Sequence, residues 1–295
     1  MLLQKIREVI LKYRKDKAEK HLQDKLRNYH VNGKVAWSEG YAEYKIEEIK
    51  KAICNPNILH AFLNKKVPAD FGVGLDERIT EYSWIFANLK REKTKFLDAG
   101  STFNFQYLIE NPIIKKKEIT IYTYYPESPN FNENKISYNY GDLRDICYKD
   151  NIFEEIVCQS TIEHIDMDNS MYGYALKGTE NIQNKSYEYL KVIIELLRVL
   201  KSQGQLLLTF PYGKFENHNF FQQLDNEMLL KIYNILQIHG TFDSNFFLYT
   251  INGWKYSTQT ECNDAESYNP HTGRGKKFDN AAHCRGICCI KFVKI

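Results

Sequence analysis

From Thr94 onward the chain alternates short apolar segments with amphipathic helical ones. The apolar segments are rich in β-branched and aromatic residues, which favours strands. Strands that alternate with helices predict an α/β fold with a mostly parallel sheet and helices on both faces. We expect the last two strands to form an antiparallel edge. The seven predicted strands are residues 94–100, 118–124, 135–142, 154–160, 205–213, 244–250 and 286–293.

Two helices are predicted between these strands. In residues 187–204 the side chains of Leu190, Ile193 and Leu197 fall on one face, and Gly204 is expected to end the helix. Residues 226–236 repeat the pattern with apolar residues at helical spacing. Both helices are therefore expected to cover the sheet.

The N-terminal part has a different character. Residues 2–28 and 44–53 predict helices, and the pair Asn55-Pro56 is expected to end the second one. We predict a helical extension over residues 1–71, acting as a lid or as a subunit contact in a homo-oligomer, and a larger domain over residues 72–295. Glu77, Arg78 and Glu81 are expected in a solvated helix start packed on that domain.

Charge and cysteine content narrow the class of protein. Forty basic residues against 37 acidic ones leave a formal charge of +3, and the lysines are scattered among acids, so no nucleic-acid partner is predicted. Charged residues interrupt the N-terminal segment, which excludes a signal peptide, and no segment has the length of a membrane span. Seven cysteines without a disulfide framework predict a reducing, cytoplasmic setting.

Two segments could suggest a metal ion. His283 with Cys284, Cys288 and Cys289 matches no zinc spacing, and "RGICCIKFV" is typical of a buried strand. The acids of "DMDN" would suit Mg²⁺, but two acids on a loop are more often solvated. No metal site is predicted.

Polar residues follow four successive strands. In an open α/β sheet, ligands bind beyond the carboxyl ends of the strands, so these residues are expected to share one site. The residues are Asp98, Gly100, Ser101, Thr102 and Asn104 after the first strand, Glu127 after the second, Asp142 after the third, and Gln159 to Asn169 after the fourth.

These segments resemble the class I S-adenosylmethionine-dependent methyltransferases. "FLDAGSTFN", "YGDLRDI", "FEEIVCQSTIEHI" and "ELLRVLKSQGQLLLTFPYG" are similar to family motifs, and the resemblance covers residues 72–295. It implies a Rossmann-like methyltransferase fold with a seven-stranded sheet. More narrowly, "GLDERITEYSW" and "STIEHIDMDNSMYG" resemble a bacterial subgroup associated with surface-polysaccharide gene clusters.

The resemblance also implies a role for each residue of a cofactor site. Asp98 and Gly100 would line the methionine end, Asp142 would face the adenine amine, and Ser160 would lie beneath the sulfonium. The usual second and third glycines are Thr102 and Asn104 here, and Tyr124 and Tyr125 stand where an acid usually ends the second strand, so Glu127 is the nearest replacement. The full predicted set is Asp98, Gly100, Ser101, Asn104, Glu127, Asp142, Leu143 and Ser160.

The segment "EHIDMDN" carries the predicted chemistry. A hydroxyl nucleophile needs a base within hydrogen-bond reach, and His164 suits this by its ordinary pKa. A histidine base predicts activity that rises through the near-neutral range. Asp166 or Asp168 could serve instead or orient the histidine, and Glu163 would brace the loop.

Two further expectations concern this region. Ser160 or Thr161 is expected to cap a helix start, with Glu163 completing a capping box. Recognition of the acceptor is assigned to Asn169, Tyr172, Tyr212 and Gln222.

The sequence therefore predicts S-adenosylmethionine-dependent methyl transfer to an oxygen of a carbohydrate or nucleotide-linked sugar. The alternatives are N-methylation of an amino sugar or small metabolite, and a cofactor-binding scaffold without chemistry, since the first motif is altered.

Overall fold

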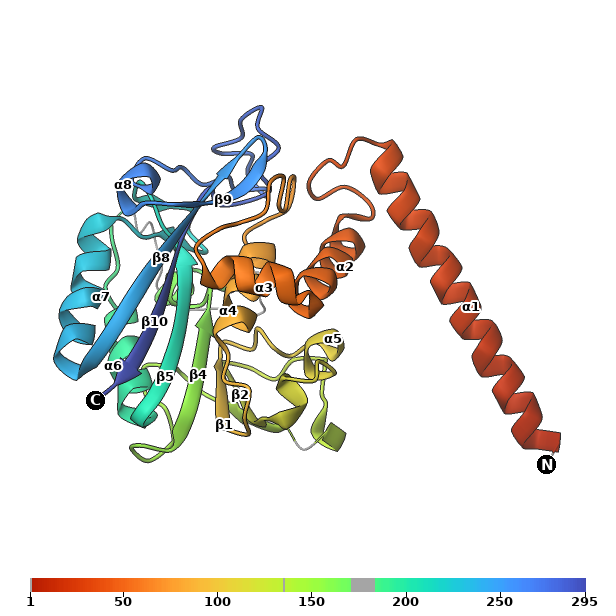
Figure 1. The fold of residues 1–295 in the computed structure, drawn as a ribbon, viewed down its shortest axis with the longest axis horizontal. Helices are drawn as coiled ribbons and strands as arrows, with labels where there is room; N and C mark the ends of the chain where they lie inside the picture. Colours follow the sequence, from red (N-terminus) through yellow and green to blue (C-terminus); the bar gives the residue numbers. More distant parts are fainter. Residues whose placement is uncertain (1, 135, 171–183) are drawn as a thin grey trace.

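A computed structural model of the chain describes residues 2–134, 136–170 and 184–295. Within these ranges one eight-stranded sheet has the order β3-β2-β1-β4-β5-β10-β8-β9 (Figure 1). The strands are β1 Lys95–Ala99, β2 Glu118–Thr123, β3 Ser137–Tyr140, β4 Phe153–Gln159, β5 Leu200–Pro211, β8 Gly240–Thr250, β9 Gly253–Ser257 and β10 Gly286–Lys294.

Strand directions explain why a binding edge forms. The pairs β1–β2, β1–β4, β2–β3 and β4–β5 are parallel, whereas β10 pairs antiparallel with both β5 and β8, and β9 pairs antiparallel with β8. The carboxyl ends of β1 to β5 therefore meet at one edge. The predicted Rossmann-like α/β fold is confirmed, with eight strands in the main sheet of the described ranges in place of seven.

The predicted antiparallel edge is wrong in detail. β10 lies inside the sheet, and β8 runs parallel to β5 on its far side. The extra strand β9 follows β8 after a two-residue connection, because Thr250 pairs with Gly253. This hairpin, and not the last strand in the sequence, forms the edge.

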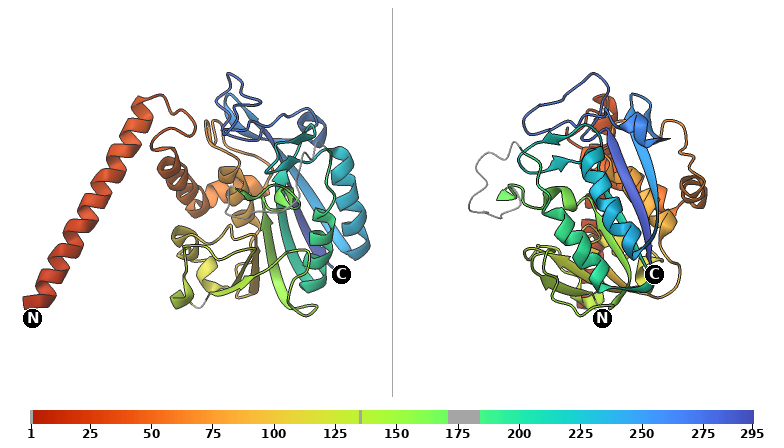
Figure 2. Two further views of the ribbon diagram at one scale, coloured as in Figure 1. Left: turned by 180° about the vertical axis from the view of Figure 1, so that it is seen from behind. Right: turned by 90° about the vertical axis from the view of Figure 1, so that its left-hand side faces the viewer.

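Helices cover both faces of the sheet (Figure 2). The two small strands β6 and β7 pair separately from the main sheet. The remaining elements are α1 Leu2–Val31, α2 Tyr41–Cys54, α3 Pro56–Leu63, α4 Arg78–Asn88, α5 Gln106–Ile109, α6 Tyr189–Val199, α7 Asn226–His239, α8 Gln259–Cys262, η1 Ile114–Lys116, η2 Asn132–Asn134, η3 Ile162–His164, β6 Glu216–Asn217 and β7 Gln222–Gln223.

Alternation along the central strands divides the interior into two cores. Successive strand residues point to opposite faces. Val157 and Leu207 accordingly pack with Phe86 of α4, while Ile156 and Leu206 pack with the helices α6 and α7 on the other face. Strands buried on both faces explain the nearly continuous apolar segments in the sequence.

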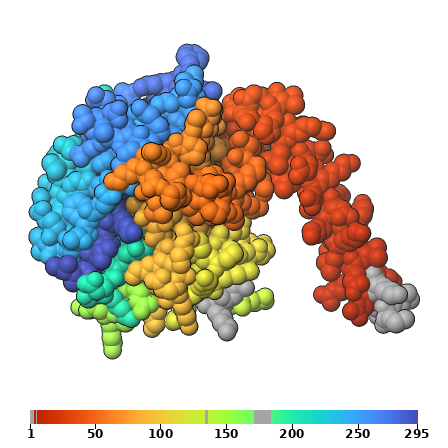
Figure 3. Space-filling view, viewed as in Figure 1, coloured from red at the N-terminus to blue at the C-terminus, as the bar shows by residue number. Residues whose placement is uncertain are grey.

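The helix α1 extends away from the body (Figures 1 and 3). Only its last turns are anchored, where the buried ring of Tyr29 meets Tyr41 and Tyr44 of α2 at centroid distances of 6.1 and 5.2 Å. The helices α2 and α3 belong to the main body, because Ile49 and Phe62 share one core with the face of the sheet that α4 covers. The predicted boundary at residues 71/72 stays a prediction.

One predicted helix end is confirmed and the other is wrong. α2 ends at Cys54, as Asn55-Pro56 predicts. A new helix follows at once, since the Asn55 side chain accepts hydrogen bonds from Asn57 and Ile58 and so caps α3, with Pro56 in its first turn. Gly204 does not end α6, which stops at Val199. A Cβ at Gly204 would lie 2.7 Å from Leu200 Cδ1, so the glycine permits close packing inside β5.

None of the described helices combines the length and the apolar composition that crossing a bilayer requires.

Candidate functional site

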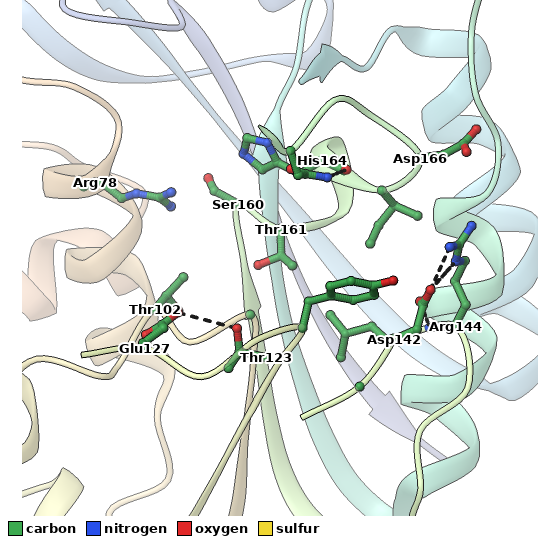
Figure 4. Close-up of a pocket in the computed structure, with 16 residues that line it drawn as sticks. Arg78, Thr102, Thr123, Glu127, Asp142, Arg144, Ser160, Thr161, His164 and Asp166 are labelled. Atoms are coloured by element: carbon green, nitrogen blue, oxygen red, sulfur yellow. Dashed lines mark hydrogen bonds and ion pairs between the residues drawn. The ribbon is translucent and has the colours of Figure 1, made fainter. Parts of the chain in front are cut away.

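A cavity of about 260 Å³ lies at the carboxyl edge of the sheet (Figure 4). Its walls come from the segments after β1, β2, β3 and β4, as the polar residues after these strands predict, and from the start of α4. The lining residues are Arg78, Gly100, Thr102, Thr123, Tyr124, Glu127, Gly141, Asp142, Leu143, Arg144, Ser160, Thr161, His164, Ile165, Asp166 and Asn169.

Asp98 holds the turn after β1 in place from the protein interior. This buried carboxylate accepts hydrogen bonds from the backbone N–H groups of Thr102 and Phe103, at 3.1 and 2.8 Å, and does not line the cavity. Burial raises the pKa of Asp98 to about 7, although these hydrogen bonds lower it. Gly100, which does line the cavity, has φ 121°, and a Cβ there would collide with the Thr161 side chain. Its lack of a side chain thus lets the segment after β4 approach the turn.

Glu127 reaches the cavity with its carboxylate held by two neighbours. Ser101 Oγ and Asn104 Nδ2 donate to Glu127 Oε2 at 2.7 and 2.9 Å. Tyr138 donates in turn to Asn104 Oδ1 at 2.9 Å. Ser101 and Asn104 are therefore not in the cavity wall, but they fix the orientation of an acid that is.

Asp142 and Leu143 both line the cavity after β3. Arg144 donates hydrogen bonds to the Asp142 carboxylate, among them one from Nη2 at 2.7 Å and one from its backbone N–H at 2.8 Å. Burial alone would raise the pKa of Asp142, but the hydrogen bonds from Arg144 outweigh it and hold the pKa below its ordinary value. The sequence prediction did not include this ion pair, although Arg144 stands two residues after Asp142.

The carboxylate of Glu81 in α4 accepts hydrogen bonds from side chains at the carboxyl ends of β4 and β5. Its Oε1 accepts from Ser160 Oγ and Thr209 Oγ1, both at 2.6 Å, and its Oε2 accepts from Gln159 Nε2 at 3.2 Å and Arg78 at 2.9 Å. The prediction of a solvated helix start is therefore wrong, since Glu81 is fully buried. Several donors and one cation compensate for that burial.

The predicted capping box is also wrong. Thr161 precedes η3, but no side chain caps this short helix, and Thr161 Oγ1 donates back to Gln159 O at 2.9 Å. Ser160 lines the cavity with φ 39°, and its hydroxyl is engaged by Glu81. Both hydroxyls thus brace the end of β4 where a helix cap was expected.

His164 faces the cavity in a defined tautomer. Its Nδ1 lies 2.7 Å from Phe220 O, and because a carbonyl oxygen can only accept, Nδ1 carries the proton and Nε2 the lone pair. Burial lowers the pKa of His164 to about 4, so the ring is neutral near pH 7. Burial raises the pKa of neighbouring Glu163 well above its ordinary value, and its Oε1 lies 4.0 Å from His164 Nε2.

Three polar residues follow His164 with different surroundings. Asp166 lines the cavity and accepts from Ser186 Oγ at 2.8 Å. Asn169 also lines it, and its amide donates to the carbonyl oxygen of His164 at 3.0 Å. Asp168 is outside the wall and accepts from the Ser170 backbone at 2.9 Å. The roles predicted for these residues stay predictions.

Two further predicted acceptor residues, Tyr212 and Gln222, do not line this cavity. Tyr212 is buried, and its hydroxyl donates to Asn263 Oδ1 at 2.6 Å. Gln222 is buried and makes two hydrogen bonds with the backbone of Ser186, at 3.0 and 2.9 Å. Tyr172 lies outside the described residues.

Sequence reasoning did not assign several wall residues to the site. Tyr124 lies in a segment that the prediction examined, and only its side-chain direction was unknown. Arg78 is different, because nothing in its local sequence indicates a helix that packs under a sheet edge formed far later in the chain. The residues added by the structure are Arg78, Thr123, Tyr124, Gly141 and Arg144.

No family model and no curated protein matches the chain. Solved structures are similar to it at low sequence identity. A SAM-dependent methyltransferase from Methanosarcina mazei is 12% identical, with TM-score 0.42 over 72% of this chain and 97% of that chain.

Two further structures carry more specific names. The 1,6-didemethyltoxoflavin-N1-methyltransferase of Burkholderia thailandensis, with 1,6-didemethyltoxoflavin and S-adenosylhomocysteine bound, is 11% identical, with TM-score 0.41 over 95% of this chain and 90% of that chain. The N-methyltransferase NodS of Bradyrhizobium japonicum, in complex with S-adenosylhomocysteine, is 11% identical, with TM-score 0.40 over 84% of this chain and 97% of that chain. At these values the function has to be inferred from the cavity itself.

Proposed function

We propose that this chain is an S-adenosylmethionine-dependent methyltransferase. The observation that carries the proposal is the convergence of four loops on one cavity: a glycine turn after β1, an acid after β2, an acid with an apolar neighbour after β3, and a partly buried neutral histidine after β4. This is the order in which the sequence motifs resemble those of the methyltransferase family.

The cavity wall offers a partner for each part of adenosylmethionine. Leu143 supplies an apolar surface for the adenine ring, and the carboxylates of Asp142 and Glu127 can accept hydrogen bonds from an amine or from ribose hydroxyls. Arg78 brings a guanidinium to the opposite wall, where it can pair with the carboxylate of the methionine part. The donor set therefore fits the cofactor.

We further propose that the acceptor is a hydroxyl of a carbohydrate or nucleotide-linked sugar. Adenosylmethionine would supply the electrophilic methyl group. His164 would take the hydroxyl proton on Nε2, because hydrogen bonding to Phe220 O holds the other ring proton on Nδ1. Asp166 and Asn169, on the same wall, would hydrogen-bond neighbouring hydroxyls.

Two adjacent tyrosines allow a matched test of cofactor binding. Tyr124 lines the cavity and Tyr125 does not, and both rings are about half exposed. Tyr124→Ala is expected to weaken adenosylmethionine binding about tenfold or more in calorimetry, since stacking of a base on an aromatic ring contributes about 1–3 kcal/mol. Tyr125→Ala is expected to change it little. If the two variants bound adenosylmethionine with equal affinity, this cavity would not be the cofactor site. If the unaltered protein did not bind adenosylmethionine, the proposed function would be refuted.

A second experiment tests the acceptor. The protein is incubated with adenosylmethionine and a panel of nucleotide-linked sugars, amino sugars and small amines, and S-adenosylhomocysteine and product mass are measured. We expect an O-methylated sugar. An N-methylated product would show that the acceptor is an amine and not a hydroxyl. Tight cofactor binding without formation of S-adenosylhomocysteine from any acceptor would identify a non-catalytic scaffold.

A further inference from the structure

Three potential metal ligands gather beside the start of α4. Within the described ranges, one carboxylate oxygen of Glu77, one ring nitrogen of His283 and the sulfur of Cys284 lie within 4.8 Å of one another. Glu77 immediately precedes α4, and the other two residues precede β10. Glu77 and Cys284 are buried, with 6% and 1% exposure, and the His283 side chain is 15% exposed.

The separations match those between ligands of one ion. His283 Nδ1 is 3.2 Å from Glu77 Oε1, and Cys284 Sγ is 3.4 Å from Glu77 Oε2. In a tetrahedral zinc site with metal–ligand bonds of about 2.0–2.3 Å, neighbouring ligand atoms lie about 3.3–3.8 Å apart. A carboxylate can bind a metal through one or both oxygens. Small adjustments would therefore bring all three groups onto a common centre.

His283 Nδ1 adds an independent observation. This atom is buried and makes no hydrogen bond, even though Glu77 Oε1 is 3.2 Å away. The nitrogen and the oxygen are close without being aligned as donor and acceptor. A buried polar atom without a hydrogen bond costs about 1–3 kcal/mol. A cation between the two atoms would give both a partner.

We propose that Glu77, His283 and Cys284 bind a zinc-type divalent cation, with the fourth position open to water or a ligand. Nitrogen and sulfur donors favour such a cation over Mg²⁺ or Ca²⁺, which prefer oxygen ligands. On binding, the Cys284 thiol releases its proton to solvent and His283 binds as the neutral imidazole. The thiolate and the carboxylate then balance the two positive charges.

The position of the ligands gives the ion a structural role. It would join the start of α4 to the segment that leads into β10, two parts of the chain that are distant in sequence. Arg78, the residue after Glu77, lines the cavity, so the ion would also fix the position of that guanidinium. The inference does not depend on the proposed function, because it predicts metal binding in the absence of any methyl donor or acceptor.

The test uses the full chain with its two exposed thiols removed by Cys54→Ser and Cys147→Ser, so that they cannot bind metal. Metal-free protein is titrated with Co²⁺ alone, and the sulfur-to-cobalt charge-transfer absorption is followed. Zinc retained through purification is measured by elemental analysis. We expect one ion per chain and a thiolate absorption band. The matched control is Cys288→Ala, a buried thiol of β10 outside the cluster, which should keep both.

Ligand variants decide the outcome. Cys284→Ser is expected to lose the thiolate band, and Glu77→Gln and His283→Ala to weaken Co²⁺ binding by at least about tenfold. Circular dichroism checks folding, and Glu77→Gln decides the question if Cys284→Ser does not fold. The absence of a thiolate band in the folded starting protein, or its persistence in Cys284→Ser, would overturn the proposal and leave an ion pair between Glu77 and a protonated His283.

Discussion

At the scale of single residues, the most consequential side chain outside the predicted set is Glu81. It is fully buried and connects Arg78 with hydroxyl groups at the ends of two strands. A local sequence pattern cannot reveal this role, because a glutamate in the first turn of an amphipathic helix is usually solvated. Only the packing of α4 beneath the sheet edge turns it into an acceptor for several donors.

Glu81→Gln is predicted to destabilise the fold by about 3 kcal/mol, since breaking a buried ion pair costs about 3–5 kcal/mol. Urea denaturation measures the change in the free energy of unfolding. Glu48→Gln is the control, because the pair of Glu48 with Lys51 lies on the surface and contributes less than about 1 kcal/mol. Similar losses in the two variants would mean that the Glu81 contacts add no stability.

His164 leads to a prediction about pH. Its folded pKa of about 4 lies below the ordinary value of 6.5, so the unfolded chain takes up a proton at a higher pH than the folded protein. The stability that the neutral ring contributes is present above about pH 6.5 and is lost as the pH falls toward about 4. His164→Asn keeps an N–H donor for Phe220 O but does not titrate. Its unfolding free energy should therefore fall less steeply than that of the unaltered protein between these values, and parallel curves would contradict the assignment.

The same shift changes the expected activity profile. The sequence predicted activity rising through the near-neutral range, whereas a base with a pKa of about 4 is already deprotonated there. The pH profile of activity therefore no longer identifies His164 as the base. His164→Ala is expected to lower turnover by about two to four powers of ten with adenosylmethionine affinity retained. Full turnover in that variant would show that a group other than His164 is the base.

At the scale of elements, the sequence predicted most strands and missed those whose signals were short. β9 begins at the glycine of Asn252-Gly253, a pair typical of tight hairpins, but Lys255 interrupts its apolar pattern. α3 was missed because Asn55-Pro56 was interpreted only as the end of a helix, whereas Pro56 also occupies the first turn of the next one. The insertion of β10 between β5 and β8 depends on long-range pairing, which no local pattern encodes.

The site follows the same division. Residues in the strand-end loops, such as Gly100, Asp142 and His164, were predicted together because parallel strands present their carboxyl ends at one edge. Arg78 reaches the cavity from a helix that is early in the chain and could not be placed. The buried contacts of Tyr212 and Gln222 were equally invisible, since a polar residue after a strand can point into the protein as well as into a cleft.

The N-terminal helices lead to a truncation experiment. Removing residues 2–20 is predicted to leave the melting temperature within about 2 °C, because this part of α1 stands away from the body and Tyr29 is retained. A chain that starts at Val67 also lacks Ile49 and Phe62 of the core. Losing each such side chain costs about 2–5 kcal/mol against a total stability of about 5–15 kcal/mol. This shorter chain should not fold, and a stable fold would support the independent extension predicted from the sequence.

At the scale of the whole molecule, α2, α3 and the sheet share one core and should unfold together. Calorimetry is expected to give a single transition, and hydrogen exchange should protect Ile49 in α2 to nearly the same extent as Val157 in β4, while the amides of the first turns of α1 exchange fast. Two separate transitions, or early exchange throughout α2, would show that the N-terminal helices form an independent unit.

The position of β10 has a consequence for synthesis on the ribosome. Nascent chains begin to fold from the N-terminal side, yet β5 and β8 are joined only by a strand made after both. Until Gly286–Lys294 emerges, the apolar edge of β5 and the β8–β9 hairpin are two open strand edges that can pair with other chains. We therefore expect nascent chains stalled before residue 286 to need a chaperone, and release of the last strand to commit the protein to its native sheet.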